Sequence, residues 1–157
     1  MSERLSEHLT LAEVAHSDTA KRLGIPNVPP PEHVANLAML AEAIFEPLRA
    51  HFGVPLYVSS GYRSEALNAA TPGAAKFSQH ALGQALDLDQ DGKGSGVTNR
   101  AVFEFIRDVL PFDQLIWEFG DDGNPDWVHV SYRPAKRRKE VLRARRVNGV
   151  AKYEPFA

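Results

Sequence analysis

Apolar residues recur at helical spacing along two stretches of the chain. The longer stretch runs from residue 34 to about residue 52 and is the strongest helical pattern in the sequence. Its apolar positions are Val34, Leu37, Ala38, Leu40, Ala41, Ile44, Phe45 and Leu48. The second stretch covers residues 99–110. A shorter helix is expected over residues 10–23, because Thr10 followed three positions later by Glu13 forms a capping-box pattern.

Short apolar or alternating runs predict the strands. They occupy residues 55–59, 85–89, 114–119 and 127–132. The turn-forming residues 121–125 join the last two runs as a hairpin, and a further hairpin is expected at 147–153 around Asn148-Gly149. Helices that are followed by antiparallel strands predict an α+β fold, with the helices packed on a small antiparallel sheet.

The length and composition fit one globular domain. The chain has 157 residues, 43% of them apolar and 24% charged, which suffices for one core but not for two ordinary domains. We therefore treat residues 1–157 as one domain, with a core over about 9–132 and a basic segment over 133–157. No apolar run approaches the roughly 20 residues of a transmembrane helix, so no membrane span is expected. The chain has no cysteine, so His and carboxylate side chains would have to bind any metal.

Positive charge is concentrated near the C-terminus. Residues 133–146 include eight Lys or Arg and one Glu, a net +7, which leaves about −9 for the rest of a chain whose net charge is −2. Such a segment can contact an anionic wall polymer or a membrane surface, or it can be a solvated hairpin or helix face. We expect no nucleic-acid partner, because the segment lacks interleaved aromatic residues and no nucleic-acid-binding module is recognisable.

The segment from Ser78 to Asp87 carries the most informative polar residues. On the predicted strand, Asp87 and Asp89 share one face and the neighbouring leucines share the other. A buried carboxylate costs several kcal/mol unless it is compensated, and a metal ion is a simple compensation. His129 lies downstream in a strongly apolar strand. His80, Asp87 and His129 would form a three-ligand set that leaves a fourth position for water, as catalytic zinc sites do.

Each of these residues has a plainer explanation on its own. A single histidine in a strand is more often a hydrogen-bonded structural residue than a ligand, and Asp87 alone could be a turn or cap residue. The combination of His-x6-Asp with a later Asp-x-x-His favours the metal site. The run from Asp87 to Gly92 also imitates the start of an EF-hand calcium loop, but position twelve would be Thr98 instead of a bidentate Glu. A weak calcium site at Asp89 and Asp91 is therefore a minor alternative.

Three motifs occur in order along the chain. They are Ser60-Gly-Tyr-Arg-Ser64, Ser78-x-His-x-x-Gly-x-Ala-x-Asp87 and Asp126-Trp-Val-His129. Together they resemble the M15 family of zinc D,D-carboxypeptidases and L-alanyl-D-glutamate endopeptidases, its phage endolysins above all, over about residues 9–132. The resemblance implies a fold of the D-Ala-D-Ala carboxypeptidase and hedgehog type. It also implies zinc at His80, Asp87 and His129 and catalysis by Asp126, three residues before the last ligand.

The chemistry of five further side chains fits this resemblance. Asp126 is the expected general base, because a carboxylate near the metal can take a proton from the attacking water and pass it to the leaving amine. Glu118, in the neighbouring predicted strand, is its rival, or else a salt-bridge partner. Arg63 suits a developing oxyanion or a substrate carboxylate, with a surface ion pair as the alternative. Ser78 and Gln79 are expected to shape the substrate site by hydrogen bonding.

The sequence therefore predicts a zinc peptidase that cuts bacterial peptidoglycan stem peptides, with the L-Ala-D-Glu bond favoured over D-Ala-D-Ala. A non-catalytic wall-binding module of the same fold is the alternative of another class. Residues 1–9 lack the basic-then-apolar layout of a signal peptide. We therefore expect synthesis in the cytoplasm and action on the cell wall after lysis or phage-assisted export.

Overall fold

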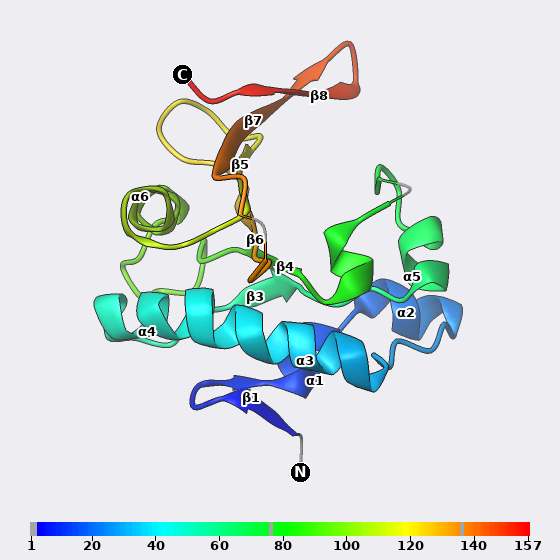
Figure 1. Cartoon of the computed structure of the whole chain (residues 1–157). Helices are drawn as coiled ribbons and strands as arrows, with labels where there is room; N and C mark the ends of the chain where they lie inside the picture. The colour runs from blue at the N-terminus through cyan, green and yellow to red at the C-terminus, as the bar shows by residue number, and fades with distance from the viewer. Residues whose placement is uncertain (1–2, 76, 136) are drawn as a thin grey trace.

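Helices make up most of the N-terminal half of the chain, and strands most of the C-terminal half (Figure 1). The computed structural model describes residues 3–75, 77–135 and 137–157. The helices are α1 (Leu11–Ala15), α2 (Asp18–Leu23), α3 (Pro31–Leu40), α4 (Glu46–Phe52), α5 (Glu65–Ala70) and α6 (Asn99–Val109), with a π-helical turn η1 (Ala41–Phe45) and a 3-10 turn η2 (Gln79–Leu82). A short hairpin of β1 (Arg4–Ser6) and β2 (Leu9–Thr10) precedes them.

The longest helical segment runs without a break from α3 through η1 to α4. It begins at Pro31, earlier than predicted, because a proline fits the first turn of a helix, where an N–H would be unsatisfied anyway. The π turn lies directly before Pro47, whose ring would clash with the carbonyl four residues back in a regular helix. The N–H of Glu46 instead bonds to the carbonyl of Ala41, five residues back. Gly53, at φ 68°, ends the segment.

The single helix predicted over residues 10–23 is wrong, because two short helices occupy this region. Thr10 caps the first of them as expected, its side chain accepting a hydrogen bond from the N–H of Glu13. Ser17 is extended and caps the second, accepting from the N–H of Ala20. The second cap turns the chain between α1 and α2.

The sheet has six strands in the order β3-β4-β6-β5-β7-β8. Its strands are β3 (Val58–Ser60), β4 (Ala85–Leu88), β5 (Gln114–Glu118), β6 (Trp127–Ser131), β7 (Glu140–Val147) and β8 (Val150–Pro155). The α+β fold is confirmed, but the sheet is mixed, because β5 and β7 are parallel. After β6 the chain turns back and pairs with the free edge of β5 as β7. Strand β7 then runs opposite to β6, as β5 does, so β5 and β7 are parallel.

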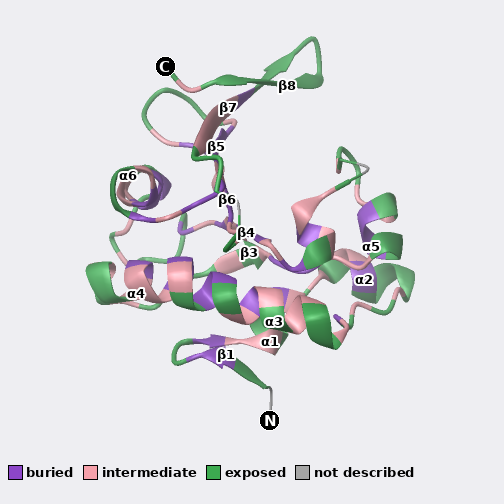
Figure 2. Ribbon diagram, viewed as in Figure 1, coloured by how far each residue is buried: buried purple, intermediate pink, exposed green. Residues whose placement is uncertain are grey.

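The two faces of the central strands differ in character. One face is apolar and packs against α6, whose side chains Val102, Phe103 and Ile106 are buried. The strand residues of this face are Leu86, Leu88, Leu115, Trp117, Val128 and Val130. The other face carries the polar residues discussed below. Figure 2 shows the buried residues gathered along the inner strands and helices, whereas β8 is exposed over its whole length.

The predicted C-terminal hairpin is present and longer than expected. Asn148 and Gly149 join β7 to β8 with φ of 53° and 77°, as a tight turn between twisted strands requires. Because β7 begins at Glu140, much of the basic stretch 133–146 is strand instead of loop. In the described part of the chain, no helix is long and apolar enough to cross a bilayer.

Candidate metal centre

The three predicted ligands come together beside the face of the sheet opposite α6. Asp87, in β4, is the direct partner of His129, in β6, so both side chains leave the sheet on the same side. His80 lies in η2, which Gly83 ends in a left-handed conformation. The His80 side chain is buried and meets the Asp87 carboxylate.

Two histidine nitrogens converge on one carboxylate oxygen. Oδ1 of Asp87 lies 3.3 Å from Nε2 of His80 and 3.2 Å from Nδ1 of His129. The three ligand atoms all lie within 4.8 Å of one another. Ligand atoms bound at about 2.0–2.1 Å to a tetrahedral zinc ion would be about 3.3 Å apart. Two imidazoles and one carboxylate at these spacings fit zinc.

A backbone carbonyl fixes the orientation of His80. Nδ1 of His80 lies 2.7 Å from the carbonyl oxygen of Gly61. When Nδ1 carries the proton and donates to this carbonyl, the lone pair of Nε2 faces Asp87 and is available to a metal. A Cβ at Gly61 would lie only 2.5 Å from the carbonyl oxygen of Val14. Glycine at position 61 therefore lets the loop approach α1 closely enough to place this carbonyl.

The ligand set is electrostatically prepared for a cation. Burial alone would raise the pKa of Asp87, but the charges and hydrogen bonds of His80 and His129 hold it well below its usual range. Nε2 of His129 is buried and has no hydrogen-bond partner among the described residues. Such an orphaned atom indicates a place where a bound molecule would complete the hydrogen bonding.

Glu118, in β5, lies on the same face of the sheet as His129. Ile116 is the direct partner of His129, and Glu118 follows it by two residues. Only 5% of Glu118 is exposed. Burial raises the pKa of Glu118 to about 7, against the opposing effect of His129, while Asp87 adds to the rise. A buried carboxyl group whose pKa lies near neutrality in the metal-free protein, on the face of the candidate ligands, is a candidate general base.

Asp126 lies at the entrance to β6 and is exposed. Its backbone N–H donates to the carbonyl of Glu118, and its carbonyl accepts from the side chain of Asn99. Among the described residues, its carboxylate has no hydrogen bond or ion pair with the ligand set. Glu118 has no such bond either among the described residues, but the charges of His129 and Asp87 act on its pKa, which makes it a candidate base beside Asp126.

Arg63 lies close to the candidate ligands and forms no ion pair with any residue that the structure describes. Its backbone N–H donates to the carbonyl of His80, which joins its loop to η2. Burial lowers the pKa of Arg63, while the charge of Asp87 opposes this shift. Its Nε is buried without a hydrogen-bond partner in the described part of the chain. A desolvated guanidinium with a free donor beside the ligands is suited to bind an anionic group.

Ser78 and Gln79 hold the loop that carries His80. The Ser78 hydroxyl accepts a hydrogen bond from the N–H of His80 and caps η2. The amide of Gln79 donates to Asp113 at 3.0 Å. Asp113 is fully buried and also accepts from Arg138. These contacts show both side chains positioning the first ligand.

The acidic residues after Asp87 are used within the protein. Asp89 accepts a hydrogen bond from the side chain of Asn99, and Asp91 from that of Asn124. Among the described residues, neither Asp89 nor Asp91 belongs to a group of three His or acidic side chains whose ligand atoms lie within 4.8 Å of one another. The fully buried Asn99 also bonds to the carbonyls of Pro125 and Asp126. These contacts tie the loop after β4 to the start of β6.

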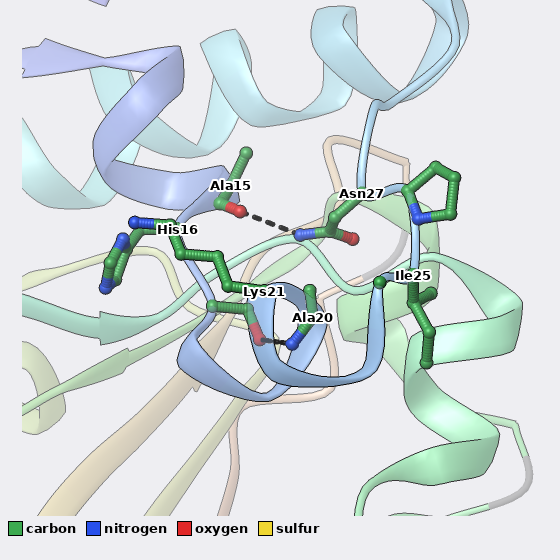
Figure 3. Close-up of a pocket in the computed structure, with 9 residues that line it drawn as sticks. Ala15, His16, Ala20, Lys21, Ile25 and Asn27 are labelled. Carbon is green, nitrogen blue, oxygen red and sulfur yellow. Dashed lines mark hydrogen bonds between the residues drawn. The ribbon is translucent and has the colours of Figure 1, made fainter.

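Asn27 is a positioning residue that the sequence did not reveal. Its amide donates to the carbonyls of Ala15 and Tyr62, and its oxygen accepts from the N–H of Ser64. Figure 3 shows Asn27 in the wall of a cavity of about 420 Å³ beside α2, which contains none of the three ligands. The local sequence marks Asn27 only as part of a proline-rich connector. Its role depends on contacts 12 and 37 residues away.

A second group of potential ligands lies far from this site. Glu7, His8 and Glu46 also bring their ligand atoms within 4.8 Å of one another. The carboxylate of Glu46 already accepts hydrogen bonds from Ser6 and from the backbone of His8. This group is more exposed than the first and serves to join the β1–β2 hairpin to the long helical segment.

Comparison with protein families gives one match. The model of the family described as Peptidase M15 matches residues 7–131. This span includes all three candidate ligands, Arg63 and both candidate bases, and it ends before β7. No curated protein matches the chain significantly.

Proposed function

The chain belongs to the peptidase M15 family, and from this premise we propose that it is a zinc-dependent peptidase of bacterial peptidoglycan stem peptides. The observation that carries the proposal is the position of Glu118. This buried carboxyl group lies on the sheet face that also presents Asp87 and His129. A ligand set alone would serve a structural ion equally well. A titratable carboxyl group beside it favours catalysis over a non-catalytic wall-binding role.

The residues divide the chemistry between them. Zinc, when held by His80, Asp87 and His129, supplies a Lewis acid that polarises the scissile carbonyl and lowers the pKa of water. Glu118 accepts a proton from the attacking water and later donates a proton to the leaving amine. Asp126, the base implied by the motif resemblance, is the alternative. Burial and electrostatic coupling to the ligands favour Glu118.

Arg63 is proposed to bind the negative charge of the substrate or of the transition state. Amide hydrolysis develops an oxyanion, and stem peptides carry free carboxylates. The unpartnered Nε of Arg63, close to Asp87, supports either use. Ser78 and Gln79 act in this proposal by holding η2, and through it His80, in place.

The bond we favour is L-Ala-D-Glu, with D-Ala-D-Ala at the end of the stem peptide as the alternative. A carboxypeptidase recognises a terminal carboxylate, for which Arg63 alone would suffice. An endopeptidase needs contacts with the substrate on both sides of the scissile bond. The sheet extends past the ligands on the side away from Arg63, through β5, β7 and β8, and this supports the endopeptidase.

We place the action of the enzyme at the cell wall, reached after lysis or by phage-assisted export. The basic stretch 133–146 is proposed to contact anionic wall polymers. Arg133 and Arg138 pair with the buried Asp113, so they are less available to a polymer. Arg137 is exposed and is the better placed residue for this contact.

Paired variants test the proposed base. Glu118→Gln should retain about one zinc ion per chain and lose at least about a hundredfold in kcat on peptidoglycan, the usual size of a general-base contribution. Asp126→Asn should stay within about threefold of the wild type, because its carboxylate is exposed at the start of β6. His80→Ala should lose both zinc and activity. An inactive Asp126→Asn beside an active Glu118→Gln would reassign the base to Asp126.

A further inference from the structure

One row of the sheet connects the proposed base to the C-terminal hairpin. Glu118 in β5 is the direct partner of Ala144 in β7, and Ala144 is the partner of Tyr153 in β8. Direct partners in neighbouring strands leave the sheet on the same side. Tyr153 therefore lies on the face that presents His129 and Glu118. The small side chain of Ala144, which is fully buried, separates Glu118 from Tyr153.

Arg146 is on the same face, two residues beyond Ala144. Its guanidinium lies over the ring of Phe119, 4.3 Å from the centroid. Phe119 directly follows Glu118 and has φ of 57°, an uncommon conformation for a bulky residue. Its N–H donates to the carbonyl of Ala144, which fixes Phe119 to β7. The cation of Arg146 is thus held beside the proposed base by a ring and not by an acid.

The arginines on the two faces of β7 differ in their partners. Arg143 and Arg145 leave the strand on the opposite side, where Arg143 pairs with Asp122 and Arg145 with Glu154. Arg146 has no ion pair among the described residues, although it is exposed and able to form one. An uncompensated cation on a functional face is available to an anionic ligand.

The electrostatics agree with this geometry. The charge of Arg146 acts on Glu118, lowering its pKa against the larger effect of burial. Burial raises the pKa of Tyr153, and the charges of Glu118 and Asp87 add to the rise. Arg146 and Tyr153 are therefore close enough to the site to interact electrostatically with its charged groups.

Two arginines flank the ligand set from opposite directions along the sheet. Arg63 comes from the loop after β3 and contacts η2, on the outer side of β4. Arg146 comes from β7, beyond β5. The metal ligands on β4 and β6 and the carboxyl group of Glu118 on β5 lie between them.

We infer that Arg146 and Tyr153 form a substrate subsite that binds a carboxylate of the peptide on the β7–β8 side of the scissile bond. The inference rests on the proposed function, and it names residues outside the matched segment 7–131. Arg146 pairs with the carboxylate. Tyr153, whose side chain is about half exposed, supplies an aromatic surface and a hydroxyl donor to the same part of the peptide. The subsite selects an acidic residue over its amidated form.

The test compares two probes that differ in one group. They are acetyl-L-Ala-γ-D-Glu-L-Lys with a free glutamyl α-carboxylate and the same peptide with an α-carboxamide. Arg146→Gln should lower kcat/KM for the acidic probe about tenfold and change that for the amide less than twofold, as expected for loss of one charge pair. Arg145→Gln is the matched control and should leave both rates unchanged, because Arg145 is on the opposite face of the same strand. Tyr153→Ala should lower kcat/KM for both probes.

A binding measurement separates this inference from the proposed function. Calorimetry with zinc-loaded Glu118→Gln should show the acidic probe binding about tenfold more tightly than the amide, and Arg146→Gln in that background should remove the difference. A difference that survives Arg146→Gln, or one that Arg145→Gln removes equally, overturns the subsite. If the wild type cleaves neither probe but the binding difference depends on Arg146, the subsite stands and the proposed reaction fails.

Discussion

Glu118 holds a carboxyl group in a buried position, and this sets a pH dependence for the metal-free protein. The folded chain retains the Glu118 proton up to a pKa of about 7, compared with the ordinary pKa of 4.5 for an exposed glutamate. Between these values the folded state binds more protons than the unfolded state. The contribution of Glu118 to folding stability therefore becomes less favourable as the pH rises from 4.5 to 7, and the loss is complete above 7.

Glu118→Gln should remove this pH-dependent loss. The stability advantage of the variant over the wild type, measured as the free energy of unfolding, should be about 2 kcal/mol larger at pH 8 than at pH 5.5. This follows because one pKa unit corresponds to about 1.4 kcal/mol. Urea unfolding of both proteins in the presence of a chelator measures the difference. A gain that is the same at both pH values would show that Glu118 titrates normally.

At the scale of elements, the loop between β3 and α5 positions two site residues through its backbone. The carbonyl of Gly61 orients His80, and the N–H of Arg63 bonds to the carbonyl of His80. Asn27 holds the same loop from the other side. The geometry of the site therefore depends on how closely this loop approaches α1.

Gly61→Ala should disturb the metal site without changing any ligand. The new Cβ would lie 2.5 Å from a backbone oxygen of Val14, so the loop must move. We expect zinc affinity to fall at least about tenfold, the usual cost of losing a partner that orients a ligand. Competition with a chromogenic chelator measures this affinity. Gly123→Ala is the control, because its nearest neighbour is the side-chain oxygen of Asp121 at 3.3 Å, and a loss of affinity there equal to that at Gly61 would contradict the mechanism.

Asp113 joins the start of the C-terminal hairpin to η2. Burial would raise its pKa, but hydrogen bonds from Arg138, Gln79 and Arg133 hold the pKa well below its usual range. Asp113→Ala removes the buried acceptor shared by Arg138, Arg133 and Gln79 and should destabilise the fold by about 3 kcal/mol, as expected when a buried charged network is broken. The exposed pair of Arg107 and Asp108 is the comparison. Asp108→Ala should leave the denaturation midpoint almost unchanged in the same titration, because an exposed pair contributes little, and equal losses would refute the structural role of Asp113.

At the scale of the whole molecule, the candidate metal ligands join two segments of the chain that are about forty residues apart. His80 precedes β4, Asp87 lies within it, and His129 lies in β6. An ion that binds only the folded chain stabilises it by about 4 kcal/mol when its concentration is a thousand times the dissociation constant. Zinc should therefore raise the melting temperature by several degrees, and His80→Ala should abolish this shift. An unchanged melting temperature at saturating zinc would argue against an ordered site.

The sequence predicts features that depend on local residue types, and it fails where the partner is distant. The three candidate ligands could be proposed from the sequence because His80 and Asp87 lie seven residues apart and β4 alternates in polarity. The burial of Glu118 could not be predicted from the sequence, because it depends on the register of β5 against β6 and on the presence of β7. The parallel β5–β7 pair, and with it the position of Arg146, likewise depends on strand order. Asn27 was missed for the same reason, since its partners lie elsewhere in the chain.

The proposed reaction is zinc-dependent cleavage of a peptidoglycan peptide bond with Glu118 as the base. The most direct measurement labels the new amino termini that appear when purified peptidoglycan is digested by the zinc-loaded protein. We predict new D-Glu amino termini with the wild type, and none above background with Glu118→Gln at equal zinc content. Free D-Ala without new D-Glu termini would reassign the bond to D-Ala-D-Ala. If the zinc-loaded wild type released neither new amino termini nor free D-Ala, the proposed peptidoglycan peptidase activity would be wrong.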